Sequence, residues 1–241
     1  MIALLRGELI KVRTTRTALG FGIASVLLVV AYVLVAMLAG DPTTASDKRD
    51  SLNVGGVLSV PLLIFGIVGA TGEYRHRTIA PAVLIAPDRI RLTLARLLAY
   101  ILTALAVGVA MVVVALALGL PLLSSQPGPD LAGDDYAMII AGGLIVASLT
   151  TALGVGVGVL VRNQVAGVVG ALIWLFILSP LLGLIDESLP SYTTLPAAGV
   201  AGGAASPDED LTWTGAVVVL VVWALVFNLL GLLAERRRDI D

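Results

Sequence analysis

The sequence predicts an all-α integral membrane protein with six transmembrane helices. Of its 241 residues, 58% are hydrophobic and only 13% are charged, whereas a soluble domain averages about 45–50% and about 25%. Six stretches without a single charge are each long enough to cross a bilayer, and the basic residues gather in alternate connecting segments. Together these observations exclude a soluble globular domain, a coiled coil and a disordered chain.

The first segment, residues 1–17, is predicted to form a helix lying on the membrane surface. Its apolar positions repeat at helical spacing, and they are Ile2, Leu5, Leu9 and Val12. Its basic residues are suited to anionic lipid headgroups, and they are Arg6, Lys11, Arg13 and Arg16. The alternative is a basic tail that only sets topology. The apolar run that follows is longer than the 7–15 residues of a cleavable signal core, so we expect a retained anchor.

Six spans follow from the requirement of about 20 apolar residues per crossing. They are predicted at 18–40, 52–72, 96–120, 136–161, 164–185 and 212–234. The third uncharged stretch is longer than a span requires. We expect its helix to end near residues 119–121, because Pro121 is followed by loop-forming residues.

The distribution of charge orients these spans. The N-terminus, the loop after the second span, the turn after the fourth and the C-terminus hold 13 of the 15 basic residues. The opposite loops hold only Lys48 and Arg49, together with 11 of the 17 acidic residues. The positive-inside rule therefore places both termini in the cytoplasm. A net charge of −2 gives no electrostatic support for a nucleic-acid partner.

The outer segment 186–211 contains an uncharged stretch that is not predicted to cross. Pro190, Pro196 and Pro207 interrupt it, and its Gly/Ala-rich sequence is only modestly hydrophobic. Short re-entrant helices are the expected form, provided that protein or a watery cavity satisfies their backbone.

The interior of the spans lacks ionisable side chains, which disfavours several functions. Proton-coupled carriers and intramembrane proteases need titratable residues at depth. There is no cysteine, and the single histidine, His76, lies in a loop. We therefore predict no enzyme activity, no catalytic residue, and no metal or cofactor held by this chain. Sodium coupling through carbonyls and hydroxyls stays open.

Scattered polar residues in the spans are candidates for lining a substrate pathway. These candidates are Ser59, Thr103, Thr150, Thr151 and Asn228. The alternative for each is a hydrogen bond to a neighbouring helix or to the preceding turn. Asn228 is the strongest candidate, since its amide is hard to satisfy against lipid. Gly154 and Gly158, four residues apart, predict close packing of two helices.

The loop after the second span, residues 73–92, mixes charged and apolar residues between prolines. It fits either an ordinary interfacial loop or a short helix that presents a face to another protein. The chain carries no ATPase of the Walker type, because neither lysine follows the glycine that such a loop requires.

Four segments resemble the permease subunit of a type-2 ATP-binding-cassette (ABC) exporter in its short, actinobacterial-like form. They are ELIKVRTTRT (8–17), GEYRHRTIAPAVLIAPDRIRLTLARLLA (72–99), LGVGVGVLVRNQVAGVVGALIWLF (153–176) and LPSYTTLPAAG (189–199). The similarity runs essentially from end to end. The Glu-Tyr-Arg-His segment is its most specific part. Arg77 and Arg96 depart from the glycine and lysine common in the family, and Pro81 is unusual within its helix.

The resemblance implies a role for three segments. Residues 1–17 would be the connecting helix, 73–86 would carry the coupling helix, and 186–210 would cap the pathway. The residues expected to contact the ATPase are Glu73, Tyr74, Arg75, His76, Arg77, Thr78 and Ile79.

The resemblance also implies partners and a location. An ABC ATPase subunit carrying ATP and magnesium would dock on the cytoplasmic face, and a second six-span permease, identical or related, would complete the pathway. The expected setting is the bilayer of a bacterial plasma membrane, and the expected cargo is a lipophilic or amphiphilic compound such as a drug or antibiotic. An ATP-independent channel, a sodium-coupled carrier and a non-transporting scaffold or sensor remain the alternatives.

Overall fold

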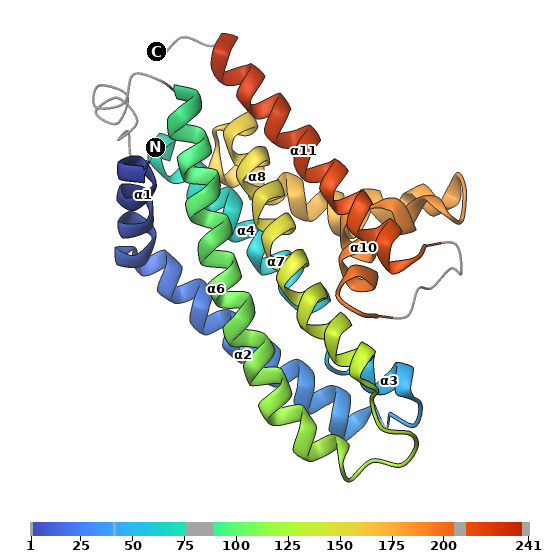
Figure 1. The fold of residues 1–241 in the computed structure, drawn as a ribbon. Coiled ribbons are helices and arrows are strands. Elements are labelled where there is room, and N and C mark those ends of the chain that lie inside the picture. The colour runs from blue at the N-terminus through green and yellow to red at the C-terminus, as the bar shows by residue number, and fades with distance from the viewer. Residues whose placement is uncertain (1, 41, 76–88, 205–210, 238–241) are drawn as a thin grey trace.

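The computed structural model describes residues 2–40, 42–75, 89–204 and 211–237 as an elongated bundle of helices (Figure 1). Within those ranges no strand is present. The longer helices are α1 (Ile2–Thr14), α2 (Arg16–Ala39), α4 (Val54–Arg75), α6 (Arg89–Leu123), α7 (Gly133–Val161), α8 (Gln164–Ile173) and α11 (Trp213–Arg237). The shorter elements are α3 (Ala45–Asp50), α9 (Ser179–Leu181) and α10 (Thr194–Ala201), a π-helix at Trp174–Leu178, and 3₁₀ turns at Leu182–Leu184 and Leu189–Tyr192.

The number of apolar helices is confirmed. The described residues contain six helical segments long and apolar enough to cross a membrane, and the predicted spans coincide with them closely. They are Arg16–Ala39, Ala45–Gly72, Ile90–Leu123, Gly133–Val161, Gln164–Leu184 and Trp213–Glu235. The two ends of the described chain lie at the same end of the bundle, as expected for an even number of long helices that run up and down it (Figure 1).

Helices α4 and α7 form the centre of the bundle. In each, 61% of the most apolar window is buried, against 17–28% in the other four spans. Glycines allow this close approach: a Cβ atom at Gly154 would collide with the Leu63 carbonyl, and one at Gly158 would lie 2.7 Å from the Ala70 Cβ. The predicted packing role of Gly154 and Gly158 is thus confirmed. Gly156, on another face of α7, brings α11 equally close.

Helix α6 is longer than the predicted span at both ends. It begins at Arg89, within the range assigned to the loop, and continues through Pro121 to Leu123. Proline removes one hydrogen-bond donor, but near the last turn this does not end the helix at once. The loop-forming residues that follow Leu123 end it instead.

The turn between α7 and α8 takes only two residues. Arg162 adopts a left-handed conformation with φ = 56°, and its N–H donates to the Gly158 carbonyl at 2.9 Å. Asn163 then caps α8, because its Oδ1 accepts from the Ala166 N–H at 3.1 Å. The Arg162 guanidinium reaches Glu235 near the end of α11 at 3.0 Å, which fixes α7 to α11 at this point.

The chain between α8 and α11 folds back into the bundle. After the π-helix and two 3₁₀ turns, α10 packs against α4, α7 and α11 (Figure 1). The hydroxyls of Ser179 and Thr193, both buried, share a hydrogen bond across this reversal. From Trp174 to Ala201 this segment is therefore largely helical and anchored among the long helices.

At the end of the bundle away from the two termini, α3 packs against the connecting segments (Figure 1). The Thr44 hydroxyl accepts from the Asp47 N–H while the Asp47 carboxylate accepts from the Thr44 N–H, a reciprocal cap. Lys48 is 1% exposed and donates to the Gly128 carbonyl at 3.3 Å, and Arg49 lies 3.3 Å from Asp135 on α7. These contacts join the segment that precedes α4 to the segment between α6 and α7 and to the start of α7.

Candidate functional site

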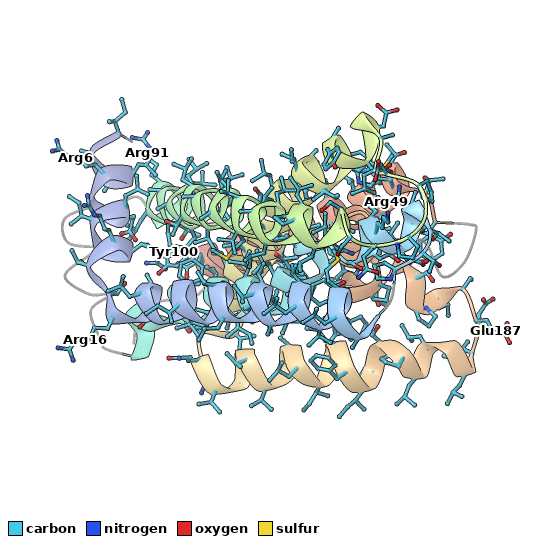
Figure 2. All side chains as sticks on the ribbon, turned by 90° about the horizontal axis from the view of Figure 1, so that it is seen from below. Arg6, Arg16, Arg49, Arg91, Tyr100 and Glu187 are labelled. Carbon is cyan, nitrogen blue, oxygen red and sulfur yellow. The ribbon has the colours of Figure 1, made fainter. Side chains whose placement is uncertain are left out.

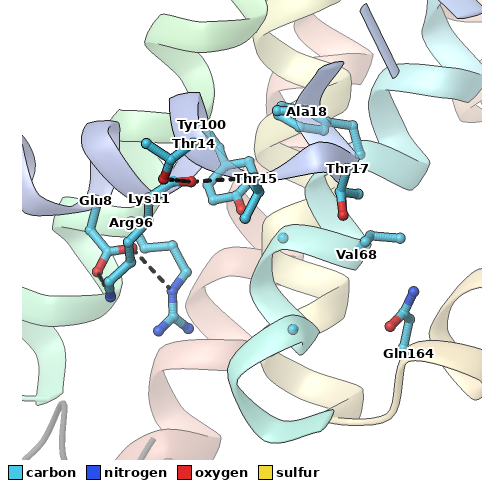
Figure 3. A pocket seen from close by; sticks show the side chains of 13 residues that line it. Glu8, Lys11, Thr14, Thr15, Thr17, Ala18, Val68, Arg96, Tyr100 and Gln164 are labelled. Carbon is cyan, nitrogen blue, oxygen red and sulfur yellow. Dashed lines mark hydrogen bonds and ion pairs between the residues drawn. The ribbon is translucent and has the colours of Figure 1, made fainter. Parts of the chain in front are cut away.

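A pocket of about 450 Å³ lies where α1 meets α4 and α6, at the end of the bundle that holds both termini (Figure 3). Glu8, Lys11, Arg96 and Tyr100 supply its polar side, and Gln164 lines it from the start of α8. Thr17 and Ala18 line it from the start of α2, so the pocket joins the N-terminal helix to four of the spans.

An ion network forms one wall of this pocket. The Glu8 carboxylate accepts from Lys11 Nζ at 2.6 Å and lies 4.0 Å from Arg96 Nε. Glu8 is 4% exposed and Arg96 is 3% exposed, so both charges are withdrawn from solvent, whereas Lys11 remains half-exposed. Buried charges are retained in proteins when they are paired, because an isolated one loses its hydration without compensation.

Arg96 also contacts α4, one of the two central helices. Its Nη1 donates to the Ala70 carbonyl on α4 at 3.5 Å. Beside it, the Tyr100 ring covers Gly69, where any side chain would overlap the phenol, and stacks at a tilt on Phe65 with ring centroids 5.0 Å apart. The contacts of Arg96 and Tyr100 thus lock the first turns of α6 onto the last turns of α4.

The expected ATPase-contacting residues follow directly from this locked region. Glu73, Tyr74 and Arg75 belong to the last turn of α4. His76, Arg77, Thr78 and Ile79 lie outside the described residues. Residues 76–88 connect the end of α4 to Arg89 at the start of α6, so the ion network lies at the base of both ends of the predicted coupling loop.

Two of the five pathway candidates share a location. Ser59 and Thr150 line a small cavity of about 10 Å³ together with Thr194. Their hydroxyls donate at 2.7 Å to carbonyls of their own helices, those of Gly56 and Val146. This small cavity adjoins a larger one of about 310 Å³, with which it shares Thr194.

The other three candidates lie apart from these cavities and also bond to carbonyls. Asn228 on α11 donates to Ala152 on α7 and to Ala224 of its own helix, both at 2.8 Å. Thr151 donates across to Leu62 on α4 at 3.4 Å, and Thr103 to Ala99 one turn back at 2.8 Å. Asn228 and Thr151 therefore hold helices together, which is the alternative that the sequence left open.

The two ends of the molecule carry different charged residues. Arg6, Arg16 and Arg91 lie at one end of the bundle, while Arg49 and Glu187 lie at the other (Figure 2). The apolar lengths of the helices separate these two sets. This arrangement has the polarity that the distribution of basic residues predicts.

Sequence reasoning missed the residues that form the ion network. Glu8 is the single acidic residue among the first 40, a signal that could have marked it. Arg96 was counted with the basic residues between the second and third spans, and its burial follows from the packing of α6 against α1 and α4. Ile2, expected on the apolar stripe of α1, is exposed, whereas Val12 of that stripe is buried.

Among the described residues, no three His, Asp or Glu side chains gather closely enough to hold a metal ion. Comparison with protein-family models and with curated proteins finds no match to this chain.

Proposed function

We propose that this chain is the membrane-spanning permease subunit of an ABC exporter, which couples to a separate ATPase and carries a lipophilic or amphiphilic compound. The proposal is supported by the six apolar helices, by spans without ionisable residues in their central parts, and by the four segments that resemble such permeases. An interior of this kind suits an uncharged or amphiphilic cargo, since ion and proton pathways need charged groups at depth.

The ion network of buried Glu8 and Arg96 with half-exposed Lys11 is the observation that carries the proposal. It links α1 to α6, and through the Ala70 carbonyl to α4, at the point from which residues 76–88 leave and return. A partner that pushes on those residues would act on α4, one of the two central helices. A ligand-driven change in the partner would in this way bias two arrangements of the spans.

The membrane placement belongs to the same proposal. Both termini and residues 73–92 face the cytoplasm of a bacterial cell, because that end of the bundle carries the basic side chains. Helix α1 lies along the inner surface, and the segment containing α10 re-enters from the outer side, where its contacts with α4, α7 and α11 shield its backbone. A second copy, or a related chain, completes the pathway.

Isolation of the chain from its native membrane tests the partner. Gentle extraction of a tagged chain, followed by mass spectrometry, is expected to recover a stoichiometric ATPase and to show whether the second six-span chain is identical. Recovery of the intact chain alone, even after crosslinking, would contradict the proposal. Flux in liposomes driven by a gradient without nucleotide would then favour the channel or carrier.

The coupling segment has its own test. Changing Arg75 and Arg77 together to Glu is expected to abolish ATPase association while leaving membrane insertion intact. Changing Arg236 and Arg237 to Glu, at the end of α11, alters charge by the same amount at the same end of the bundle and serves as the control. Normal association and normal coupled ATPase activity in the first variant would remove residues 73–79 from the interface.

A further inference from the structure

The cavity of about 310 Å³ lies between α7, α8 with its π-helix, and α11, and α10 closes one part of it. Its walls are almost entirely apolar: Leu63, Leu153 and Val157 line one side, and the rings of Trp174, Trp223 and Phe227 line another. The Trp174 and Trp223 indoles meet at a tilt with ring centroids 5.4 Å apart, and Trp223 stacks on Phe227 with centroids 5.9 Å apart. Small-molecule sites commonly have this size and apolar, aromatic lining.

Two polar groups in this lining have no partner. The Trp174 Nε1 and the Thr194 Oγ1 are both buried, and neither makes a hydrogen bond. Thr194 is 4% exposed, so its hydroxyl is shielded from solvent and from lipid. By contrast, the neighbouring Trp223 Nε1 donates to the Tyr192 carbonyl at 3.1 Å. Buried donors without partners are rare in folded proteins, and their presence calls for a group that accepts from them.

The adjoining hydroxyls do not supply that group. Ser59 and Thr150 share the small cavity with Thr194, but each already donates its proton to a carbonyl of its own helix. The proton of Thr194 and the N–H of Trp174 are thus the uncommitted donors in this region of the described structure.

The positions of the two cavity tryptophans along their spans indicate what kind of ligand the cavity would bind. Trp174 is the eleventh residue of the 21-residue span Gln164–Leu184, and Trp223 is the eleventh of the 23-residue span Trp213–Glu235. Tryptophan is normally enriched at the two surfaces of a membrane rather than at mid-span. A phospholipid would present its polar head near a helix end and only acyl chain at mid-span, where it could not satisfy these donors.

We propose that this cavity is a binding site for a compact, uncharged, largely aromatic or alicyclic compound that carries an oxygen acceptor such as a ketone. The apolar body lies against Leu153, Val157 and Phe227, and the oxygen accepts from Trp174 Nε1 and Thr194 Oγ1. The cavity belongs to one chain, so binding requires neither the ATPase nor a second copy and stands apart from the proposed transport cycle.

A matched pair of probes tests the site. The chain is embedded alone in phosphatidylcholine nanodiscs, and equilibrium dialysis measures retention of 2-acetylnaphthalene and of 2-ethylnaphthalene, which has the same shape without the oxygen. Retention above that of protein-free nanodiscs is expected for the ketone at one equivalent per chain. The hydrocarbon is expected to bind about three- to tenfold more weakly, since it leaves both donors unpaired.

Two variants remove one donor each. Thr194→Val and Trp174→Phe are both expected to weaken ketone binding about three- to tenfold. Thr194→Val should leave retention of the hydrocarbon unchanged, whereas Trp174→Phe also removes part of the aromatic wall and should lower ketone retention more than hydrocarbon retention. Thr194→Val should fold normally, because its hydroxyl makes no hydrogen bond that the change would break. Thr103→Val is the control, since that hydroxyl bonds to Ala99 on α6, away from the cavity.

A spectroscopic measurement tests directly for the hydrogen bond between the ketone and the Trp174 N–H. The chain has three tryptophans, so Trp213→Phe leaves the two that line the cavity. The ketone is expected to shift the indole N–H hydrogen-bond band of the ultraviolet resonance Raman spectrum, and the hydrocarbon is not. Equal retention of the two probes, no effect of either variant, or a tightly held phospholipid that the ketone fails to displace would each overturn the proposal. Absence of an ATPase partner would leave this binding unchanged, so the two proposals fail separately.

Discussion

The Glu8 carboxylate on α1 lies 4.0 Å from the Arg96 Nε on α6, and both side chains are almost completely buried. These residues are 88 positions apart, and α1 is otherwise held mainly by its packing on α6. The pair therefore sets where the N-terminal helix lies relative to the base of α4 and α6. Its energetic weight can be measured directly.

A double-mutant cycle with Glu8→Gln and Arg96→Gln measures that weight. Each single change leaves a buried charge with less compensation. The losses of stability in the two single variants are therefore expected to add up to more than the loss in the double variant. The coupling free energy should be about 1–3 kcal/mol, read from unfolding in mixed micelles with increasing SDS. Lys11→Gln is the control: its side chain is 52% exposed, and a loss below about 1 kcal/mol is expected. A coupling near zero would mean that the pair does not hold α1.

Gly154→Ala tests the packing of the two central helices. The added methyl group would overlap the Leu63 carbonyl on α4, which is backbone and cannot rotate away. We expect a loss of about 1–3 kcal/mol in the free energy of unfolding, as is typical of overpacking. Gly20→Ala on α2 has open space around the new atom and should be neutral or slightly stabilising, because alanine favours helix. Equal effects of the two changes would contradict the close approach of α4 and α7.

Asn228→Leu separates a structural role from a pathway role. The change removes the 2.8 Å bond to the Ala152 carbonyl, which links α11 to α7, and should cost about 0.6–2 kcal/mol. Thr103→Val, which removes a bond within one helix, should change stability much less. If Asn228→Leu leaves unfolding unchanged but alters transport in the reconstituted complex, Asn228 lines the pathway instead.

Asp186 predicts a local pH dependence in the segment before α10. Hydrogen bonds from the Ser188 hydroxyl at 2.7 Å and from its backbone N–H at 2.9 Å lower the pKa of Asp186 below its ordinary value of 3.8. A lowered folded-state pKa means that these bonds stabilise the turn above about pH 4, and that this stabilisation is lost as pH falls through the lowered value.

Ser188→Ala removes the larger of these two causes and should raise the pKa of Asp186 toward 3.8. The measurement is the titration of the Asp186 carboxyl carbon by NMR in micelles of ¹³C-labelled protein. Ser124→Ala is the matched control, because that hydroxyl donates to the Pro121 carbonyl at 2.7 Å. An unchanged titration in Ser188→Ala would show that the turn does not hold the carboxylate.

The helices were predictable to within a few residues because the hydrophobic length needed to cross a bilayer is a local property of the sequence. The ends of α6 were less predictable, since residues 89–95 are too polar to be recognised as part of a span and form helix where α6 packs against α1 and α4. Likewise, Gly154 and Gly158 indicated close packing, but their spacing did not identify α4 as the partner.

By itself, the sequence determined the number of apolar helices, the separation of charge between the two ends, and the absence of ionisable groups from the central parts of the spans. Tertiary structure alone decided that Glu8 meets Arg96, that Ser59 and Thr150 lie beside Thr194, and that Trp174 and Thr194 line one cavity. The physical reason is the distance along the chain over which each effect acts. Hydropathy and charge act residue by residue along the chain, whereas the pairing of buried polar groups depends on which helices approach one another, and steric fit between distant segments decides that.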